Sequence, residues 1–213
     1  MNLTEYIVSY YNRRFSNFPA VNLRNIIEMF KTPNMVVVEV GVFEGATTTC
    51  YADIVKSLNG HIYVIDWFKG SELVNSFDEN YLLNKFKKNT EDYQDSITIL
   101  QGKSHEMLST LPDQFADLIF IDADHRYEFV YNDIQIAKQK IKPGGILCGH
   151  DCENIAFANN FPKEWLKEDC VKNDRYGVVH YGVVQAVYDH FQNNVLIVED
   201  GATNSNIWIK KYE

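Results

Sequence analysis

The feature that most constrains this sequence is a regular alternation of short apolar runs and longer helical patterns between residues 34 and 151. The apolar runs, which we expect to be strands, are 35–40, 61–65, 97–100, 117–121 and 146–149. Helical patterns are expected from about Thr47 to the Asn59-Gly60 stop, and over 78–92, 104–111 and 127–141. Because strands joined by helices lie parallel in one sheet, the sequence predicts an α/β fold with a doubly wound sheet.

The segments that flank this alternation complete a single predicted domain. Its four parts are an N-terminal helical cap (1–33), the core (34–151), an irregular insertion (152–181) and a C-terminal part (182–213). In the C-terminal part we expect a helix over 183–191 and strands over 195–198 and 206–210. Two consecutive strands indicate an antiparallel edge, which brings the predicted sheet to seven mostly parallel strands.

Composition limits the classes of partner. The chain has 213 residues, a formal net charge of −9 and a pI of about 5.1, which argues against nucleic acid or an anionic membrane as the main partner. No apolar run reaches the roughly 20 residues that span a bilayer, and the first residues lack a signal pattern. We therefore expect a cytoplasmic protein with four free cysteines. Whether the chain forms a homo-oligomer is left open by the sequence.

The turn after the first predicted strand indicates a ligand site. Gly41 and Gly45 allow a tight turn and a close approach of the backbone to a ligand. Their spacing differs from the Gly-x-Gly-x-x-Gly that binds a pyrophosphate, and Phe43 would crowd such a group, so an NAD-type site is disfavoured. Asp66 ends the second strand, where a carboxylate can accept both hydroxyl protons of a ribose. Together these residues predict a nucleoside ligand without a pyrophosphate.

Five stretches in order carry a resemblance to a known family. They are VEVGVFEGATTT, YVIDWF, LQGKSHEML, LIFIDADHRYEFVYND and IKPGGILCGHDC, within residues 36–152. The chain resembles class I S-adenosylmethionine-dependent methyltransferases, in particular small O-methyltransferases similar to the macrocin and catechol enzymes and proteins of the cephalosporin hydroxylase type. This resemblance implies a Rossmann-like fold and S-adenosylmethionine as cofactor.

The resemblance also implies roles for individual residues. The turn with Glu39, Gly41, Phe43 and Gly45 would lie under the methionine part of the cofactor. Asp66, with Trp67 beside it, would hold the ribose. The loop of Gly102, Lys103 and Ser104 would lie beside the adenine, where His105 could stack. Asp122 would face the methionine amine and, in metal-dependent members, also bind the ion.

The ends of two predicted neighbouring strands suggest a metal site. Asp122 ends one strand, and His150 and Asp151 follow the other. Carboxylates suit Mg²⁺, which we expect here, whereas the histidine, which stands where the catechol-type enzymes carry an aspartate, suits transition metals better. An alternative is zinc bound by Cys148, His150 and Cys152, which share one face of a strand, but no second cysteine pair is present.

Methyl transfer to a hydroxyl requires an aligned acceptor and loss of its proton. In the metal-dependent relatives the base is a lysine three residues after the metal-binding aspartate, and here that position is His125. We therefore expect His125, Asp122 and His150 to be the catalytic residues, with His150 as the alternative base and Asp124 orienting His125. The role of His180 is undecided.

The expected function is divalent-metal-assisted O-methylation of a small hydroxylated metabolite such as a sugar, a polyketide or a phenol. The aromatic insertion 152–181 is expected to act as the lid over this acceptor. Two alternatives are a methyltransferase-fold protein of the cephalosporin hydroxylase type with other chemistry and a non-catalytic nucleoside-binding module. A dinucleotide-dependent oxidoreductase is a third and less favoured alternative.

Overall fold

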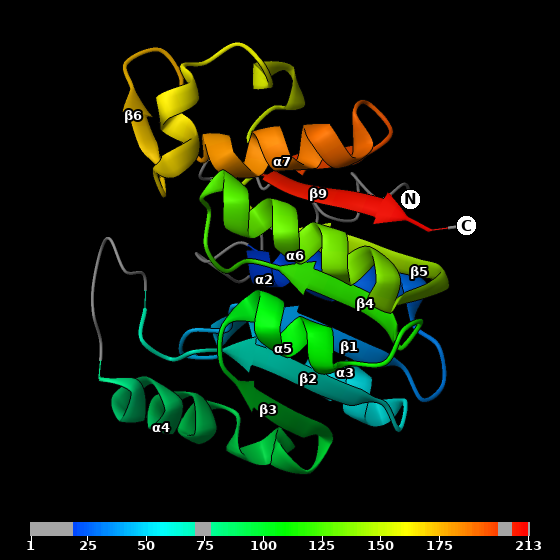
Figure 1. Cartoon of the computed structure of the whole chain (residues 1–213). Coiled ribbons are helices and arrows are strands. Elements are labelled where there is room, and N and C mark those ends of the chain that lie inside the picture. Colours follow the sequence, from blue (N-terminus) through cyan, green and yellow to red (C-terminus); the bar gives the residue numbers. More distant parts are fainter. Residues whose placement is uncertain (1–18, 71–77, 200–205, 213) are drawn as a thin grey trace.

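The computed structural model describes residues 19–70, 78–199 and 206–212. A seven-stranded sheet with the order β3-β2-β1-β4-β5-β9-β8 forms its centre (Figure 1). The strands are β1 (Val36–Val40), β2 (His61–Asp66), β3 (Ile97–Gln101), β4 (Ala116–Ile121), β5 (Ile141–Gly149), β8 (Leu196–Glu199) and β9 (Asn206–Lys211). Strands β1 to β5 pair in parallel, whereas β9 pairs antiparallel with both β5 and β8. The predicted fold class and antiparallel C-terminal edge are confirmed.

Helices cover both faces of the sheet. They are α2 (Pro19–Phe30), α3 (Ala46–Ser57), α4 (Glu79–Asn89), α5 (Ser104–Thr110), α6 (Tyr127–Lys140) and α7 (Tyr181–Phe191), with a 3₁₀ helix η1 (Glu91–Ser96). Alternate residues of a strand point to opposite faces. In β1, Val37 therefore packs with α2 and α3, whereas Val38 packs with α6 and α7. This two-sided burial explains why the strands are continuous apolar runs.

Strand β5 begins earlier than expected. We predicted a helix to Ile141 and a stop at residues 142–145, but the helix ends at Lys140 and the strand begins at Ile141. Ala116 pairs with Ile141 and Leu118 already with Ile146, so residues 142–145 form an irregularity within the strand. Pro143 lies in this irregularity, where its missing N–H leaves no gap in the regular ladder.

The insertion contains more regular structure than the sequence indicates. It holds two short 3₁₀ helices, η2 (Ile155–Phe157) and η3 (Lys163–Lys167), and a hairpin of β6 (Val171–Asn173) with β7 (Gly177–Val179). Figure 1 shows it beside α7 at one end of the molecule. Of the predicted N-terminal cap, residues 1–18 lie outside the described residues. None of the helices in the described ranges is long and apolar enough to cross a membrane.

Candidate active site

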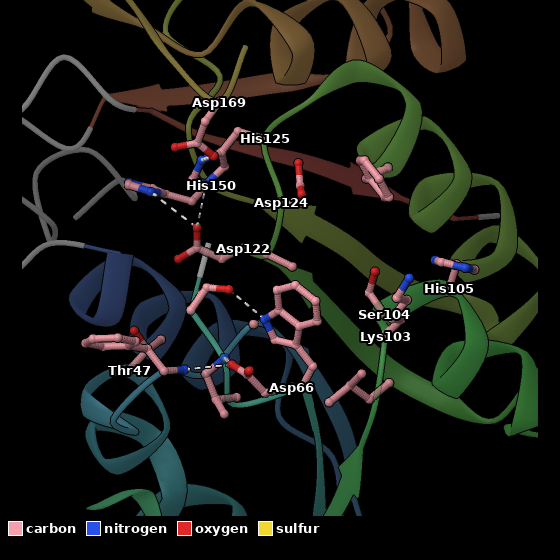
Figure 2. Close-up of a pocket in the computed structure, with 18 of the residues that line it drawn as sticks. Thr47, Asp66, Lys103, Ser104, His105, Asp122, Asp124, His125, His150 and Asp169 are labelled. Atoms are coloured by element: carbon pink, nitrogen blue, oxygen red, sulfur yellow. Dashed lines mark hydrogen bonds and ion pairs between the residues drawn. The ribbon is translucent and has the colours of Figure 1, made fainter. Parts of the chain in front are cut away.

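A cavity of about 610 Å³ opens at the carboxyl ends of the central strands, where the strand order reverses between β1 and β4 (Figure 2). This is the place at which open α/β sheets bind ligands. Most of the predicted site residues line it: Gly41, Phe43, Asp66, Trp67, Gly102, Lys103, Ser104, Asp122, His125 and His150. The expected neighbours Asp124 and His105 line it as well. The structure therefore brings the candidate cofactor and catalytic residues to one cavity.

The turn after β1 fits closely against the end of β4. Gly41 has a φ of +85°, and a Cβ atom there would lie 2.0 Å from the carbonyl oxygen of Asp122. Asp66 stabilises the same turn, because its Oδ2 accepts hydrogen bonds from the backbone N–H groups of Val42 and Phe43, both at 2.9 Å. Its Oδ1 accepts from Phe68 N at 2.7 Å. Asp66 thus lies where a ribose contact was predicted, and it also holds the turn.

Glu39 and Gly45 do not line the cavity, although both were expected among the cofactor residues. Glu39 is fully buried, and its Oε2 accepts hydrogen bonds from the hydroxyls of Thr48 at 2.7 Å and Tyr51 at 2.6 Å. Burial raises the pKa of Glu39 to about 7. Gly45 is the N-cap of α3. Both residues therefore fix α3 beneath the turn.

A cluster of histidines and carboxylates forms the opposite wall of the cavity (Figure 2). His125 Nε2 lies 3.0 Å from Asp151 Oδ2, and His125 Nδ1 lies 3.1 Å from Asp169 Oδ1. His150 Nδ1 lies 3.1 Å from Asp151 Oδ1. Asp122 Oδ1 is 3.8 Å from both His125 Nε2 and His150 Nδ1. The predicted metal group of Asp122, His150 and Asp151 thus has ligand atoms within 4.8 Å of one another.

The carboxylates change the protonation of this cluster. Burial alone would lower the pKa of His125, but Asp122, Asp151 and Asp169 outweigh it and raise that pKa well above its usual value. Burial would raise the pKa of Asp151, but His125 and His150 hold it well below its usual range. These carboxylates therefore favour the protonated form of the His125 imidazole. The role of His125 as a base stays a prediction.

The model of a methyltransferase domain family matches residues 38–152 of this chain. The chain belongs to this family. A protein of unknown function from Acanthamoeba polyphaga mimivirus, R132, is 26% identical over 141 residues. That match covers 64% of this chain and 60% of the viral protein. The resemblance inferred from the five sequence stretches is confirmed at the level of the family.

Solved methyltransferase structures share the fold of this methyltransferase domain. A Klebsiella pneumoniae protein assigned as an O-methyltransferase aligns with a TM-score of 0.67 at 12% identity, over 100% of this chain and 91% of its own. The O-methyltransferase of Bacillus cereus, in complex with SAH, aligns with a TM-score of 0.63 at 15% identity, over 99% and 90% of the two chains. At these identities the likeness establishes the fold.

The cysteine-based zinc site is not supported in this methyltransferase domain. Cys148 and Cys152 are buried, and the Cys148 thiol donates to the carbonyl of Ile119 at 3.5 Å. Neither group of potential metal ligands found among the described residues includes a cysteine. Burial also raises the pKa of both thiols, which disfavours the thiolate that zinc binds.

The insertion contacts the cavity through a single described residue, Asp169. Its aromatic side chains instead pack on one another and on α7. Phe161, for example, stacks on Trp165 with ring centroids 4.9 Å apart and meets Tyr181 edge-on at 5.3 Å. Sequence reasoning missed Asp169, because a single acidic residue in an irregular segment gives no periodic signal. The lid is still a prediction, and its described contact with the cavity is this carboxylate.

Proposed function

We propose that this protein is an S-adenosylmethionine-dependent O-methyltransferase that acts, with a divalent ion, on a small hydroxylated molecule. The observation that carries the proposal is one cavity with two chemically different walls. One wall holds the glycine turn, Asp66 and the loop before α5, and the other holds the histidine–carboxylate cluster. The first suits a nucleoside cofactor, and the second suits an acceptor hydroxyl.

The relatives support the choice of cofactor. The Bacillus cereus enzyme and a Podospora anserina methyltransferase are described with SAH, and Aeropyrum pernix fibrillarin is described with S-adenosylmethionine. The cavity volume of about 610 Å³ lies within the range of roughly 300–1,000 Å³ that is usual for small-ligand pockets. Three of the roughly four lone-pair sites of the Asp66 carboxylate accept backbone N–H groups, which leaves one on Oδ1 for a ribose hydroxyl.

The donor set of Asp122, His150 and Asp151 fits a divalent ion. Two carboxylates supply hard oxygen ligands, and the imidazole adds a nitrogen ligand. A bound ion would orient the acceptor oxygen and stabilise its deprotonated form. We assign deprotonation of the acceptor to this effect of the ion, with His125 as the predicted alternative base.

The test is the release of S-adenosylhomocysteine over a panel of sugars, polyketides and phenols, with and without a chelator. We expect activity with at least one acceptor class, its loss on chelation and its recovery with Mg²⁺. Asp122→Asn should abolish the recovery, whereas Asp113→Asn, at an exposed carboxylate that does not line the cavity, should not. Calorimetric binding of S-adenosylmethionine without turnover on any acceptor would favour the non-catalytic nucleoside-binding module. Tighter binding of NAD would refute the proposal.

A further inference from the structure

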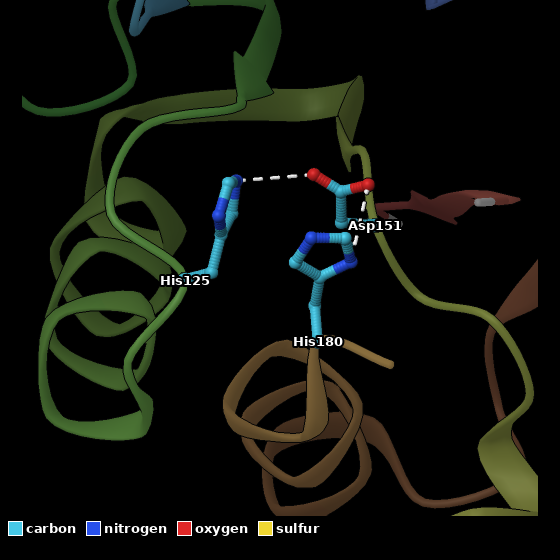
Figure 3. A group of neighbouring side chains, drawn as sticks. All are labelled: His125, Asp151 and His180. Atoms are coloured by element: carbon cyan, nitrogen blue, oxygen red, sulfur yellow. Dashed lines mark ion pairs between the residues drawn. The ribbon is translucent and has the colours of Figure 1, made fainter. Parts of the chain in front are cut away.

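We propose a second metal site, in which His125, Asp151 and His180 bind one divalent transition-metal ion (Figure 3). This site shares Asp151 with the group of Asp122 and His150 but uses two different histidines. It does not depend on the proposed methyl transfer, because it is inferred from the donor atoms alone.

The three side chains have the spacing that an ion requires. One ligand atom of each lies within 4.8 Å of the other two. His125 Nε2 is 3.0 Å from Asp151 Oδ2, and the rings of His125 and His180 have centroids 4.7 Å apart. Ligands about 2.1 Å from a tetrahedral ion lie roughly 3.4 Å from one another. Small side-chain movements therefore convert this arrangement into a coordination shell.

Each histidine has a carboxylate at its Nδ1, and His180 Nδ1 also lies 3.4 Å from Asp151 Oδ1. Asp169 lies 3.1 Å from His125 Nδ1, and Glu153 lies 2.6 Å from His180 Nδ1. Glu153 also accepts the backbone N–H of His180. Carboxylates behind metal-binding histidines fix the tautomer and direct the lone pair of Nε2 toward the ion. His125 Nε2 is buried and faces Asp151 Oδ2 at 3.0 Å, and Figure 3 shows the second ring nitrogen of His180 on the side of His125.

The donor set selects the class of ion. Two imidazoles and one carboxylate match Zn²⁺, Co²⁺ or Fe²⁺, whereas Mg²⁺ prefers an octahedral shell of oxygens. His125 lines the cavity, and Asp151 and His180 lie behind it. An ion held by three protein ligands at this wall would keep further positions open toward the cavity, as catalytic metal sites do.

A close contact between the start of α7 and the loop after β4 brings His180 to the site. His180 precedes α7, and the N-terminus of α7 lies against the loop that leaves β4. A Cβ atom at Gly182 would lie 2.3 Å from the carbonyl oxygen of His125 and 2.4 Å from Tyr127 N. Only a glycine permits this contact, so the sequence at 182 is matched to the close approach of the two histidines.

The experiment is a titration of the full chain, stripped by a chelator, with Co²⁺ in the absence of cofactor and acceptor. Heat and the visible d–d absorbance are recorded, and Zn²⁺ and Mg²⁺ are then added as competitors. His180→Gln removes a ligand of the proposed site only, and Asp122→Asn removes a ligand of the neighbouring group only. His105→Gln, a histidine of α5 outside both groups, is the matched control.

We expect the parent to bind Co²⁺ with absorbance typical of a four- or five-coordinate ion, with Zn²⁺ but not Mg²⁺ displacing it. His180→Gln should weaken binding by more than about tenfold. Asp122→Asn and His105→Gln should change it by less than about threefold. Unchanged affinity in His180→Gln, loss of binding only in Asp122→Asn, displacement by Mg²⁺, or no binding to the folded parent would each overturn the proposal.

Circular dichroism shows whether His180→Gln folds. If it does not fold, a second variant still tests the proposed site. Glu153→Gln leaves His180 in place but removes the carboxylate behind it, and we expect it to weaken Co²⁺ binding by about 10–100-fold. Unchanged affinity in a folded Glu153→Gln protein would then count against the site. Because the titration contains no S-adenosylmethionine, failure of methyl transfer leaves its result unaffected, and the two proposals fail separately.

Discussion

Glu39 offers a stability test of the turn beneath the candidate cofactor site. Its carboxyl group is fully buried, accepts two hydroxyl hydrogen bonds through Oε2 and leaves Oε1 without a hydrogen bond. Burial raises its pKa from 4.5 to about 7. The folded state therefore binds a proton that the unfolded state releases between these two values. Stability contributed by this group is complete below pH 4.5 and is lost as the pH rises through about 7.

The magnitude follows from the two pKa values. Each pKa unit corresponds to about 1.4 kcal/mol, so ionising Glu39 in the folded protein costs about 3 kcal/mol above pH 7. Glu39→Gln removes the ionisation while its side-chain carbonyl can still accept from Thr48 and Tyr51. We expect the variant to equal the parent within about 1 kcal/mol near pH 4.5 and to exceed it by up to about 3 kcal/mol near pH 8.

The assay is urea-induced unfolding of both proteins at a series of pH values. The quantity that matters is the difference between the two free energies of unfolding, because other titrating groups affect both proteins equally. Glu44→Gln, in the same turn but partly exposed and beside Lys85, is the matched control and should run parallel to the parent. If Glu39→Gln also runs parallel to the parent between pH 4.5 and 8, the pKa of Glu39 is not raised and the argument fails.

Further predictions concern the turn and the cofactor. Gly41→Ala should destabilise the fold by about 3 kcal/mol or more, because its Cβ would meet the Asp122 carbonyl. Gly144→Ala, with a similar φ of +81° and no atom within 4 Å, should cost only about 1–2 kcal/mol, and equal effects in thermal unfolding would exclude the clash as the cause. Asp66→Ala should weaken calorimetric binding of S-adenosylhomocysteine by about 1–3 kcal/mol. Unchanged affinity would remove Asp66 from ribose recognition.

The parallel core of the fold was predictable because its signals are local and strong. Strands buried on both faces are continuous apolar runs, and polar residues such as Asp66 and Asp122 mark their ends. The start of β5 was not predictable in this way. Lys142-Pro143-Gly144-Gly145 has the composition of a turn, and only its pairing with β4 on both sides of the irregularity makes it part of a strand. Tertiary pairing overrides the local preference here.

Some residues of the candidate site could likewise be predicted from local sequence signals, and others could not. Residues at strand ends, such as Asp122, His150 and Asp151, could be grouped from the sequence because the strands that carry them are neighbours in the sheet. Asp169 and His180 could not, since they lie in a segment without hydrophobic periodicity and reach the site through the packing of the insertion and α7. The aromatic residues that suggested an acceptor lid instead form the packing that holds this segment in place.

Two close backbone contacts bring these distant segments together at the loop that leaves β4. Gly41 allows the cofactor turn to lie against Asp122, and Gly182 allows α7 to begin against His125. Only two residues lie between the two contact points, Asp122 and His125, so the walls proposed for the cofactor and for the metal meet at one short piece of backbone. A methyl group on the cofactor side and an ion on the histidine side would therefore face each other across residues 122–125. The position of the cofactor methyl group relative to an acceptor oxygen held beside the ion would therefore depend on this backbone packing.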